Sequence, residues 1–124
     1  TQAGRNQTIL LVDDEESVLD VAREVLSMNG YTVFTAGSGE EALKTYTAEA
    51  VDLTVLDLGM PGIGGEACLR RLIEIDPGAR VVLASGYGAH KMAQYPEKYG
   101  AAAFLSKPYR VEDLLRVIQE ALTD

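Results

Sequence analysis

Three carboxylates stand where apolar runs of this chain end. Asp57 follows the apolar run Leu53–Leu56. Asp13 and Asp14 follow the run Ile9–Val12. In open parallel α/β sheets, ligands bind at the carboxyl ends of the strands. Two strands that deliver carboxylates to one edge of a sheet therefore indicate a site for a hard cation and for phosphate chemistry.

Two further polar residues, Ser85 and Lys107, follow later apolar runs and would reach the same edge. Clustered carboxylates raise the pKa of one of their number unless a cation neutralises the group. A bound metal and a lysine would offset charge on transferred oxygens, and a hydroxyl would donate a hydrogen bond. Because carboxylates are known covalent phosphate acceptors, this set of residues predicts phosphoryl transfer to a carboxylate.

The elements that would position these residues alternate along the chain. Short apolar or β-branched runs, as in strands covered on both faces, occupy residues 9–12, 32–35, 53–56, 80–84 and 102–105. Helical segments are predicted at residues 16–28, from 38 onward, at 65–75, in a short stretch near 89–94, and at 111–122. This alternation predicts βαβ units and a parallel sheet.

Length and composition predict one ordinary globular domain. We expect residues 1–7 of the 124 to be a polar leader segment and residues 8–124 to be the domain. Eleven acidic and three basic side chains lie among residues 1–62, which accounts for the whole net charge of −8. The chain has no basic stripe and no apolar run of about 20 residues, so neither nucleic-acid binding nor membrane contact is expected.

The single cysteine, Cys68, cannot form a disulfide within the chain. It falls on the apolar stripe of the segment 65–75, so we expect it to pack as a small apolar side chain. A lone cysteine also favours a reducing compartment, and we expect a cytoplasmic location.

Over residues 8–122 the sequence resembles the receiver domains of two-component signalling. The resemblance rests on the order and spacing of four features: Asp13-Asp14, the segment Asp57–Pro61 with Gly65, Ser85, and Lys107-Pro108. It implies a flavodoxin-like, doubly wound, five-stranded parallel sheet of order 2-1-3-4-5 with five helices. Pro96 leaves room for only a short fourth helix.

The resemblance also implies a role for each matched position of the metal site. Asp57 would be the phosphorylated aspartate. Asp13 and Asp14 would bind Mg²⁺, or Mn²⁺ in its place, together with Asp57. The backbone carbonyl of Gly59 would complete the protein ligands.

The remaining matched positions would bind the phosphoryl group and change conformation when it binds. Ser85 and Lys107 would contact the phosphoryl group. Ser85 and Phe104 would act as switch residues, because Ser85 moves inward and Phe104 fills the vacated space. The Lys107-Pro108 peptide bond would be cis, which costs little before proline.

The implied function is a phosphoacceptor in a phosphorelay, which takes its phosphoryl group from a histidine kinase or a phosphotransfer domain. Such a chain is a signalling domain rather than an enzyme. The segment Ser85-Gly86-Tyr87 and the short fourth helix favour a receiver that belongs to a hybrid sensor histidine kinase.

Two alternatives stay open at this point. The first is a phosphohydrolase with an aspartate nucleophile, although such enzymes usually carry a second acid where this chain has Gly59. The second is a receiver that acts by protein contact without being phosphorylated.

Overall fold

The computed structural model describes residues 6–60, 63–86 and 91–123 of the chain. Its strands are β1 (Thr8–Val12), β2 (Thr32–Ala36), β3 (Leu53–Asp57), β4 (Val81–Ser85) and β5 (Ala103–Ser106). Its helices are α1 (Glu16–Met28), α2 (Gly39–Ala48), α3 (Gly64–Ile75), α4 (Lys91–Gln94) and α5 (Val111–Leu122), with a short 3₁₀ helix, η1, at Pro96–Tyr99.

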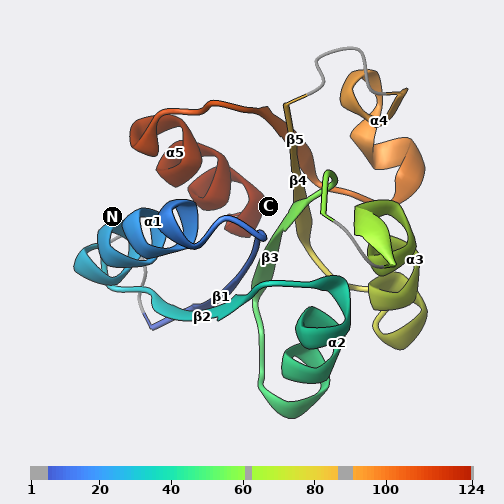
Figure 1. Ribbon diagram of the computed structural model, residues 1–124, viewed down its shortest axis with the longest axis horizontal. Helices are drawn as coiled ribbons and strands as arrows, with labels where there is room; N and C mark the ends of the chain where they lie inside the picture. The colour runs from blue at the N-terminus through green and yellow to red at the C-terminus, as the bar shows by residue number, and fades with distance from the viewer. Residues whose placement is uncertain (1–5, 61–62, 87–90, 124) are drawn as a thin grey trace.

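The five strands form one parallel sheet in the order β2-β1-β3-β4-β5, as the sequence predicts (Figure 1). The register aligns the ends of neighbouring strands, since Val12 pairs with Ala36 and Asp57 pairs with Ala84. Parallel strands all present their carboxyl ends at the same edge. The sheet therefore brings residues that are about 45 positions apart in the sequence to one place.

Two apolar clusters hold the helices against the two faces of the sheet. On one face, Ile9, Leu11 and Val55 pack with side chains of α1 and α5, including Leu19 and Ile118. On the other face, the core continues into α2, α3 and α4 through residues such as Ala42, Cys68, Leu72 and Met92. Figure 1 shows the same division, with α1 and α5 together on one side of the sheet. Both faces are covered, which explains the unbroken apolar runs of the strands.

Cys68 lies inside the second cluster with no solvent exposure, so the prediction that it packs as an apolar side chain is confirmed. Burial, and to a lesser extent the charge of Glu40, raises the pKa of the Cys68 thiol to about 11. The thiol therefore stays protonated at neutral pH.

Four strands end one residue later than predicted: β2, β3, β4 and β5. In β3 and β4 the added residues are Asp57 and Ser85, which a search for apolar runs excludes. Both still take part in the ladder, because Asp57 pairs with Ala84 and Ser85 pairs with Ser106. Backbone hydrogen bonds form between strands whatever the polarity of the side chains. The strands therefore continue into the polar residues at the edge of the sheet.

The helix predicted from residue 38 onward begins with Ser38 as its N-cap, in an arrangement close to a capping box. The Ser38 hydroxyl accepts a hydrogen bond from the backbone N–H of Glu41 at 3.1 Å. The Glu41 carboxylate reaches back and accepts from the backbone N–H of Gly37 at 2.7 Å, one residue before the position in the usual capping box. These bonds satisfy backbone donors at the beginning of the helix.

The segment between β4 and β5 differs most from the prediction. A helix is expected near residues 89–94, and the structure has α4 at Lys91–Gln94, while residues 89 and 90 lie outside the described ranges. A 3₁₀ helix that the sequence did not reveal then begins at Pro96. Proline lacks the N–H that an interior helical position needs but is well tolerated in a first turn, so Pro96 starts η1 rather than continuing α4.

Two residues of the predicted leader segment run beside the rest of the fold. The backbone N–H of Asn6 donates to the carbonyl of Gly30, and the carbonyl of Gln7 accepts from Thr32. Residues 1–5 of that segment lie outside the described ranges.

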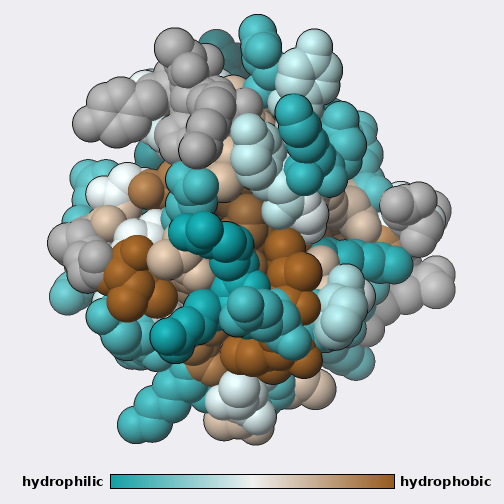
Figure 2. Space-filling model, turned by 90° about the vertical axis from the view of Figure 1, so that its right-hand side faces the viewer, coloured by the Kyte–Doolittle hydropathy of each residue, from teal (hydrophilic) through white to brown (hydrophobic). Residues whose placement is uncertain are grey.

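Helix α1, with 13 residues, is well short of the about 20 that a membrane span needs, and no helix in the described ranges could cross a bilayer. The side of the molecule that carries α3 and α4 shows small hydrophobic patches between hydrophilic side chains (Figure 2). Scattered apolar side chains of this kind are ordinary on protein surfaces.

Candidate functional site

Backbone hydrogen bonds fix the chain just beyond each strand at the carboxyl edge of the sheet. The N–H of Asp13 donates to Ala36 at 3.0 Å, the N–H of Leu58 donates to Ala84 at 2.8 Å, and the N–H of Lys107 donates to Ser85 at 2.9 Å. The residues after β1, β3 and β5 are therefore held by the neighbouring strand rather than left as free loops. The sheet positions the polar residues predicted for the site.

Three carboxylates meet at this edge. Asp13, Asp14 and Asp57 each offer an oxygen that lies within 4.8 Å of the other two. Asp13 and Asp57 are buried, each with 5% of its surface exposed, whereas Asp14 is exposed. The close approach predicted from the two apolar runs is thus present, and two of the three charges are shielded from water.

Lys107 supplies the positive charge of the cluster. Its Nζ lies 2.7 Å from Asp13 Oδ2, 3.3 Å from Asp57 Oδ2 and 3.7 Å from Glu15 Oε1. Burial by itself would lower the pKa of Lys107, but the hydrogen bond to Asp13 and the charges of Asp57 and Asp13 outweigh it and raise the pKa to about 12. The ammonium is therefore charged at any physiological pH.

The pKa of the Asp57 carboxyl is raised by some neighbouring groups and lowered by others, and the net effect is a raised pKa. Burial raises its pKa above the ordinary value of 3.8, and the charge of Asp13 adds to that effect. A hydrogen bond from the backbone N–H of Gly59 to Asp57 Oδ1, at 3.0 Å, lowers the pKa, as does Lys107. A buried carboxylate that is held by two donors keeps a defined orientation toward the sheet edge.

The donor set fits a divalent cation. Three carboxylates and one ammonium leave two negative charges uncompensated, which one divalent ion would neutralise. All three donors are oxygen atoms, which Mg²⁺ and Mn²⁺ prefer, and exposed Asp14 leaves a side open for the waters that Mg²⁺ retains. Asp13 is pre-oriented, because its Oδ1 accepts a hydrogen bond from the backbone N–H of Glu15 at 2.9 Å.

The other predicted site residues lie on the adjoining strands. Ser85 ends β4 and is buried, with 1% of its surface exposed. Phe104 lies on β5 opposite Leu83, half-buried against the cluster under α3 and α4. The Lys107-Pro108 peptide bond is cis, as the sequence predicts.

An open cleft of about 580 Å³ lies over the acidic cluster. Its lining comes from the ends of β1, β3, β4 and β5 and from the first turn of α1, namely Asp14, Glu15, Val18, Asp57, Gly59, Gly86, Lys107, Pro108 and Tyr109. Glu15 and Tyr109 line the cleft although neither is among the predicted site residues. Glu15 could have been predicted, because it belongs to the acidic run 13–16. For Tyr109 the only indication in the sequence is its position two residues after Lys107.

The chain is thus a doubly wound parallel sheet with three carboxylates and a lysine at its carboxyl edge. The family model described as the response regulator receiver domain matches residues 9–119. The chain belongs to this family and is a receiver domain of two-component signal transduction.

Relatives of very different length share this domain. The chain is 33% identical over 117 residues to sporulation initiation phosphotransferase F of Bacillus subtilis, with 94% of each chain covered. It is also 33% identical over 124 residues to sensor kinase CckA of Brucella abortus, covering 98% of this chain but only 13% of the kinase.

Among solved structures, a chain of the CheX–CheY–BeF₃–Mg²⁺ complex from Borrelia burgdorferi superposes with a TM-score of 0.89 at 27% identity. The match covers 95% of this chain and 90% of that one. The flavodoxin-like architecture predicted from the sequence is thereby confirmed.

Proposed function

We propose that this receiver domain accepts a phosphoryl group on Asp57. The observation that carries the proposal is the contact of the Lys107 ammonium with Asp57, within a cluster of three carboxylates at the mouth of an open cleft. Asp57 and Asp14 both line the cleft, but of these two only Asp57 is buried and lies within 4 Å of Lys107. It is therefore the carboxylate that an incoming phosphoryl group can reach with a positive charge beside it.

The phosphoryl donor we propose is a phosphohistidine on a histidine kinase or on a phosphotransfer domain. An oxygen of the Asp57 carboxylate attacks phosphorus, a P–O bond forms, and the P–N bond breaks. The electron pair of that bond stays on the imidazole nitrogen, which takes up a proton. Lys107, whose Nζ lies 3.3 Å from Asp57 Oδ2, would pair with the transferred oxygens.

A divalent cation belongs to the same proposal. Bound Mg²⁺, or Mn²⁺, supplies positive charge that offsets the charge of the transferred group. Asp13, Asp14 and Asp57 would hold it, and the backbone carbonyl of Gly59 would be a further protein ligand. The similarity to a CheY complex that contains BeF₃ and Mg²⁺ supports this part, because BeF₃ mimics a phosphoryl group on a carboxylate.

We infer that Ser85 and Phe104 change conformation when Asp57 is phosphorylated. Ser85 ends the strand beside Asp57 and would donate a hydrogen bond to a phosphoryl oxygen. Phe104 lies on the next strand and packs on the side of α3 and α4, so movement of Ser85 would alter its surroundings. The readout would then be a change in a protein-interaction surface.

The wider context is also a proposal. We infer that the domain acts without catalysis of its own and that its parent chain is a hybrid sensor histidine kinase. The match to a short part of a sensor kinase supports this parentage. A cytoplasmic location, with no direct nucleic-acid or membrane contact by this segment, is supported by the unpaired thiol of Cys68 and by the acidic charge balance.

The test is acceptor labelling from a small acyl-phosphate donor in the presence of Mg²⁺, followed by intact mass measurement. The wild-type chain should gain the mass of one phosphoryl group, and hydroxylamine should release it, as expected of an acyl phosphate. Asp57→Asn should gain none. Asp52→Asn is the matched control, because Asp52 is an exposed acid at the opposite end of β3 and should leave labelling unchanged.

Labelling of Asp57→Asn at the wild-type level would refute the assignment of the acceptor. Sustained turnover of a phosphate ester by the wild-type chain would instead support the phosphohydrolase alternative. Equal affinity for the output partner with and without beryllofluoride would support a receiver that acts without phosphorylation.

A further inference from the structure

A small cavity lies directly beneath the acidic cluster. It measures about 10 Å³ and is bounded by β1, β3 and α1, with Asp13 and Asp57 among its lining residues. Most of the remaining lining is apolar, from side chains such as Val55, Leu19 and Ala22. A cavity of about this size holds one water molecule, provided that polar partners are present.

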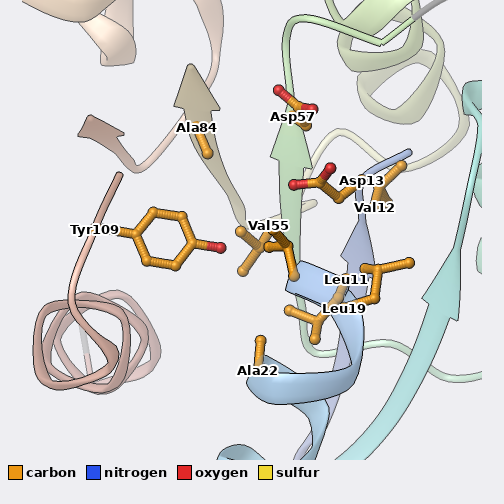
Figure 3. Close-up of a pocket in the computed structure, with 10 residues that line it drawn as sticks. Leu11, Val12, Asp13, Leu19, Ala22, Val55, Asp57, Ala84 and Tyr109 are labelled. Carbon is orange, nitrogen blue, oxygen red and sulfur yellow. The ribbon is translucent and has the colours of Figure 1, made fainter. Parts of the chain in front are cut away.

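The side chain of Tyr109 lines one side of this cavity. Figure 3 shows the Tyr109 side chain reaching inward from the segment before α5, with its hydroxyl toward the space beside Val55 and below the carboxylates. Tyr109 also lines a groove of about 290 Å³ on the outside, between α1 and α5, together with Val18 and Val111. Tyr109 thus lines both the inner cavity and the outer groove.

The Tyr109 hydroxyl is affected by the charges of Asp13, Asp57 and Lys107. Burial raises the pKa of Tyr109, and the negative charges of Asp13 and Asp57 raise it further against the opposing effect of Lys107. The hydroxyl is therefore a proton donor at neutral pH, and it lies on the side of the cavity below the two carboxylates. Within the described ranges, no side chain or backbone group hydrogen-bonds to it.

We propose that Tyr109 is a positioning residue of the metal site: its hydroxyl donates to one water molecule in the cavity, and that water donates to the carboxylates of Asp13 and Asp57. This arrangement gives the water three partners and gives the hydroxyl an acceptor. It also gives each carboxylate a fixed donor from below, in addition to the donors above. The inference rests on the proposed function, because it concerns the orientation of the same carboxylates that would bind Mg²⁺.

If this arrangement is present, removing the Tyr109 hydroxyl should weaken the binding of Mg²⁺. Outer groups that orient metal ligands typically change affinity by about 10- to 100-fold when they are removed. Because the contact runs through a water, we expect the lower end, a Kd for Mg²⁺ raised about tenfold in Tyr109→Phe. The ring stays in place in this variant, so its packing between α1 and α5 is retained.

The experiment is a calorimetric titration of Mg²⁺ into the wild-type chain, Tyr109→Phe and Tyr95→Phe. Tyr95 is 59% exposed and outside the cleft, so loss of its hydroxyl is the matched control and should leave the Kd unchanged. The melting temperature of Tyr109→Phe should stay close to the wild-type value without Mg²⁺. A crystal structure should contain an ordered water within hydrogen-bonding distance of Tyr109 Oη.

Wild-type Mg²⁺ affinity in Tyr109→Phe would overturn the inference and leave the proposed function intact. A crystal structure with the Tyr109 hydroxyl turned out of the cavity, or with a dry cavity, would overturn it as well. If the wild-type chain itself binds no Mg²⁺ and takes no phosphoryl group on Asp57, the proposed function fails and this inference fails with it.

Discussion

At the scale of single residues, the site depends on one ammonium group among buried acids. Lys107 contacts Asp13 and Asp57, and both carboxylates have little exposure to water. Taking charges out of water is costly, and the cost is repaid only when a partner of opposite charge is close. Lys107 therefore has a structural role before any phosphoryl group arrives.

We predict that Lys107→Met lowers the free energy of unfolding by about 2 kcal/mol at pH 7 without divalent metal, because it leaves the buried carboxylates unpaired. The pKa of Asp57 is already raised by burial and loses the lowering effect of Lys107 in this variant. The folded state then binds protons more readily than the unfolded state, so stability rises as the pH falls through the carboxyl range. The deficit should shrink accordingly in urea unfolding measured at successively lower pH.

Lys44→Met, at an exposed position on α2, serves as the control and should change little. A loss of stability in Lys107→Met that does not vary with pH would show that the lysine stem, rather than its charge, is what matters.

At the scale of elements, β3 carries the proposed acceptor Asp57 at its carboxyl end and a buried polar group without a described partner in its interior. All five of its residues are buried. Asp57 at its carboxyl end has two donors, whereas the buried hydroxyl of Thr54 has no hydrogen-bond partner among the described residues. A buried polar group without a partner costs free energy that its removal recovers.

We predict that Thr54→Val raises the free energy of unfolding by about 1 kcal/mol, because valine has nearly the same shape and lacks the buried hydroxyl. The comparison is Thr32→Val on β2, where the threonine is exposed and the change should be close to zero. Chemical unfolding with unchanged slope would measure both. Destabilisation of Thr54→Val would indicate that a partner of the hydroxyl, such as an internal water, stabilises the native strand.

At the scale of the whole molecule, the excess negative charge belongs to the half of the chain that supplies the three carboxylates at the edge of the sheet. The first 62 residues carry the full net charge of −8, and the acidic cluster lies in that half apart from its lysine. A ligand that binds only the folded state adds to its stability by mass action. Metal binding should therefore be visible in the unfolding of the entire domain.

We predict that Mg²⁺ at tenfold above its Kd raises the free energy of unfolding by about 1.4 kcal/mol, with a rise of several degrees in melting temperature. Chelation should reverse the rise, and sodium chloride of equal ionic strength should produce less of it. Asp13→Asn should lose the response, whereas Glu49→Gln, which removes an exposed acid outside the cleft, should keep it. An equal response in all three chains would mean that Mg²⁺ acts only by screening charge.

The architecture and most of the acidic site can be predicted from the amino-acid sequence. Apolar runs and helical stripes report burial directly, because each position must satisfy the face of the sheet or helix on which it lies. Once five strands alternate with helices, parallel pairing follows, and Asp13, Asp14, Asp57 and Lys107 must reach one edge. Their order along the chain was enough to predict the cluster that the structure contains.

The contacts between individual atoms of the site, and the cavity beneath it, depend on the three-dimensional packing of the elements. Backbone pairing carries β3 and β4 through Asp57 and Ser85, which no apolar pattern indicates. The cavity beneath the cluster exists because α1, β3 and Tyr109 meet there, although they are far apart in the sequence. Contacts of this kind depend on the packing of whole elements, so the spacing of residues within one segment carries no signal for them.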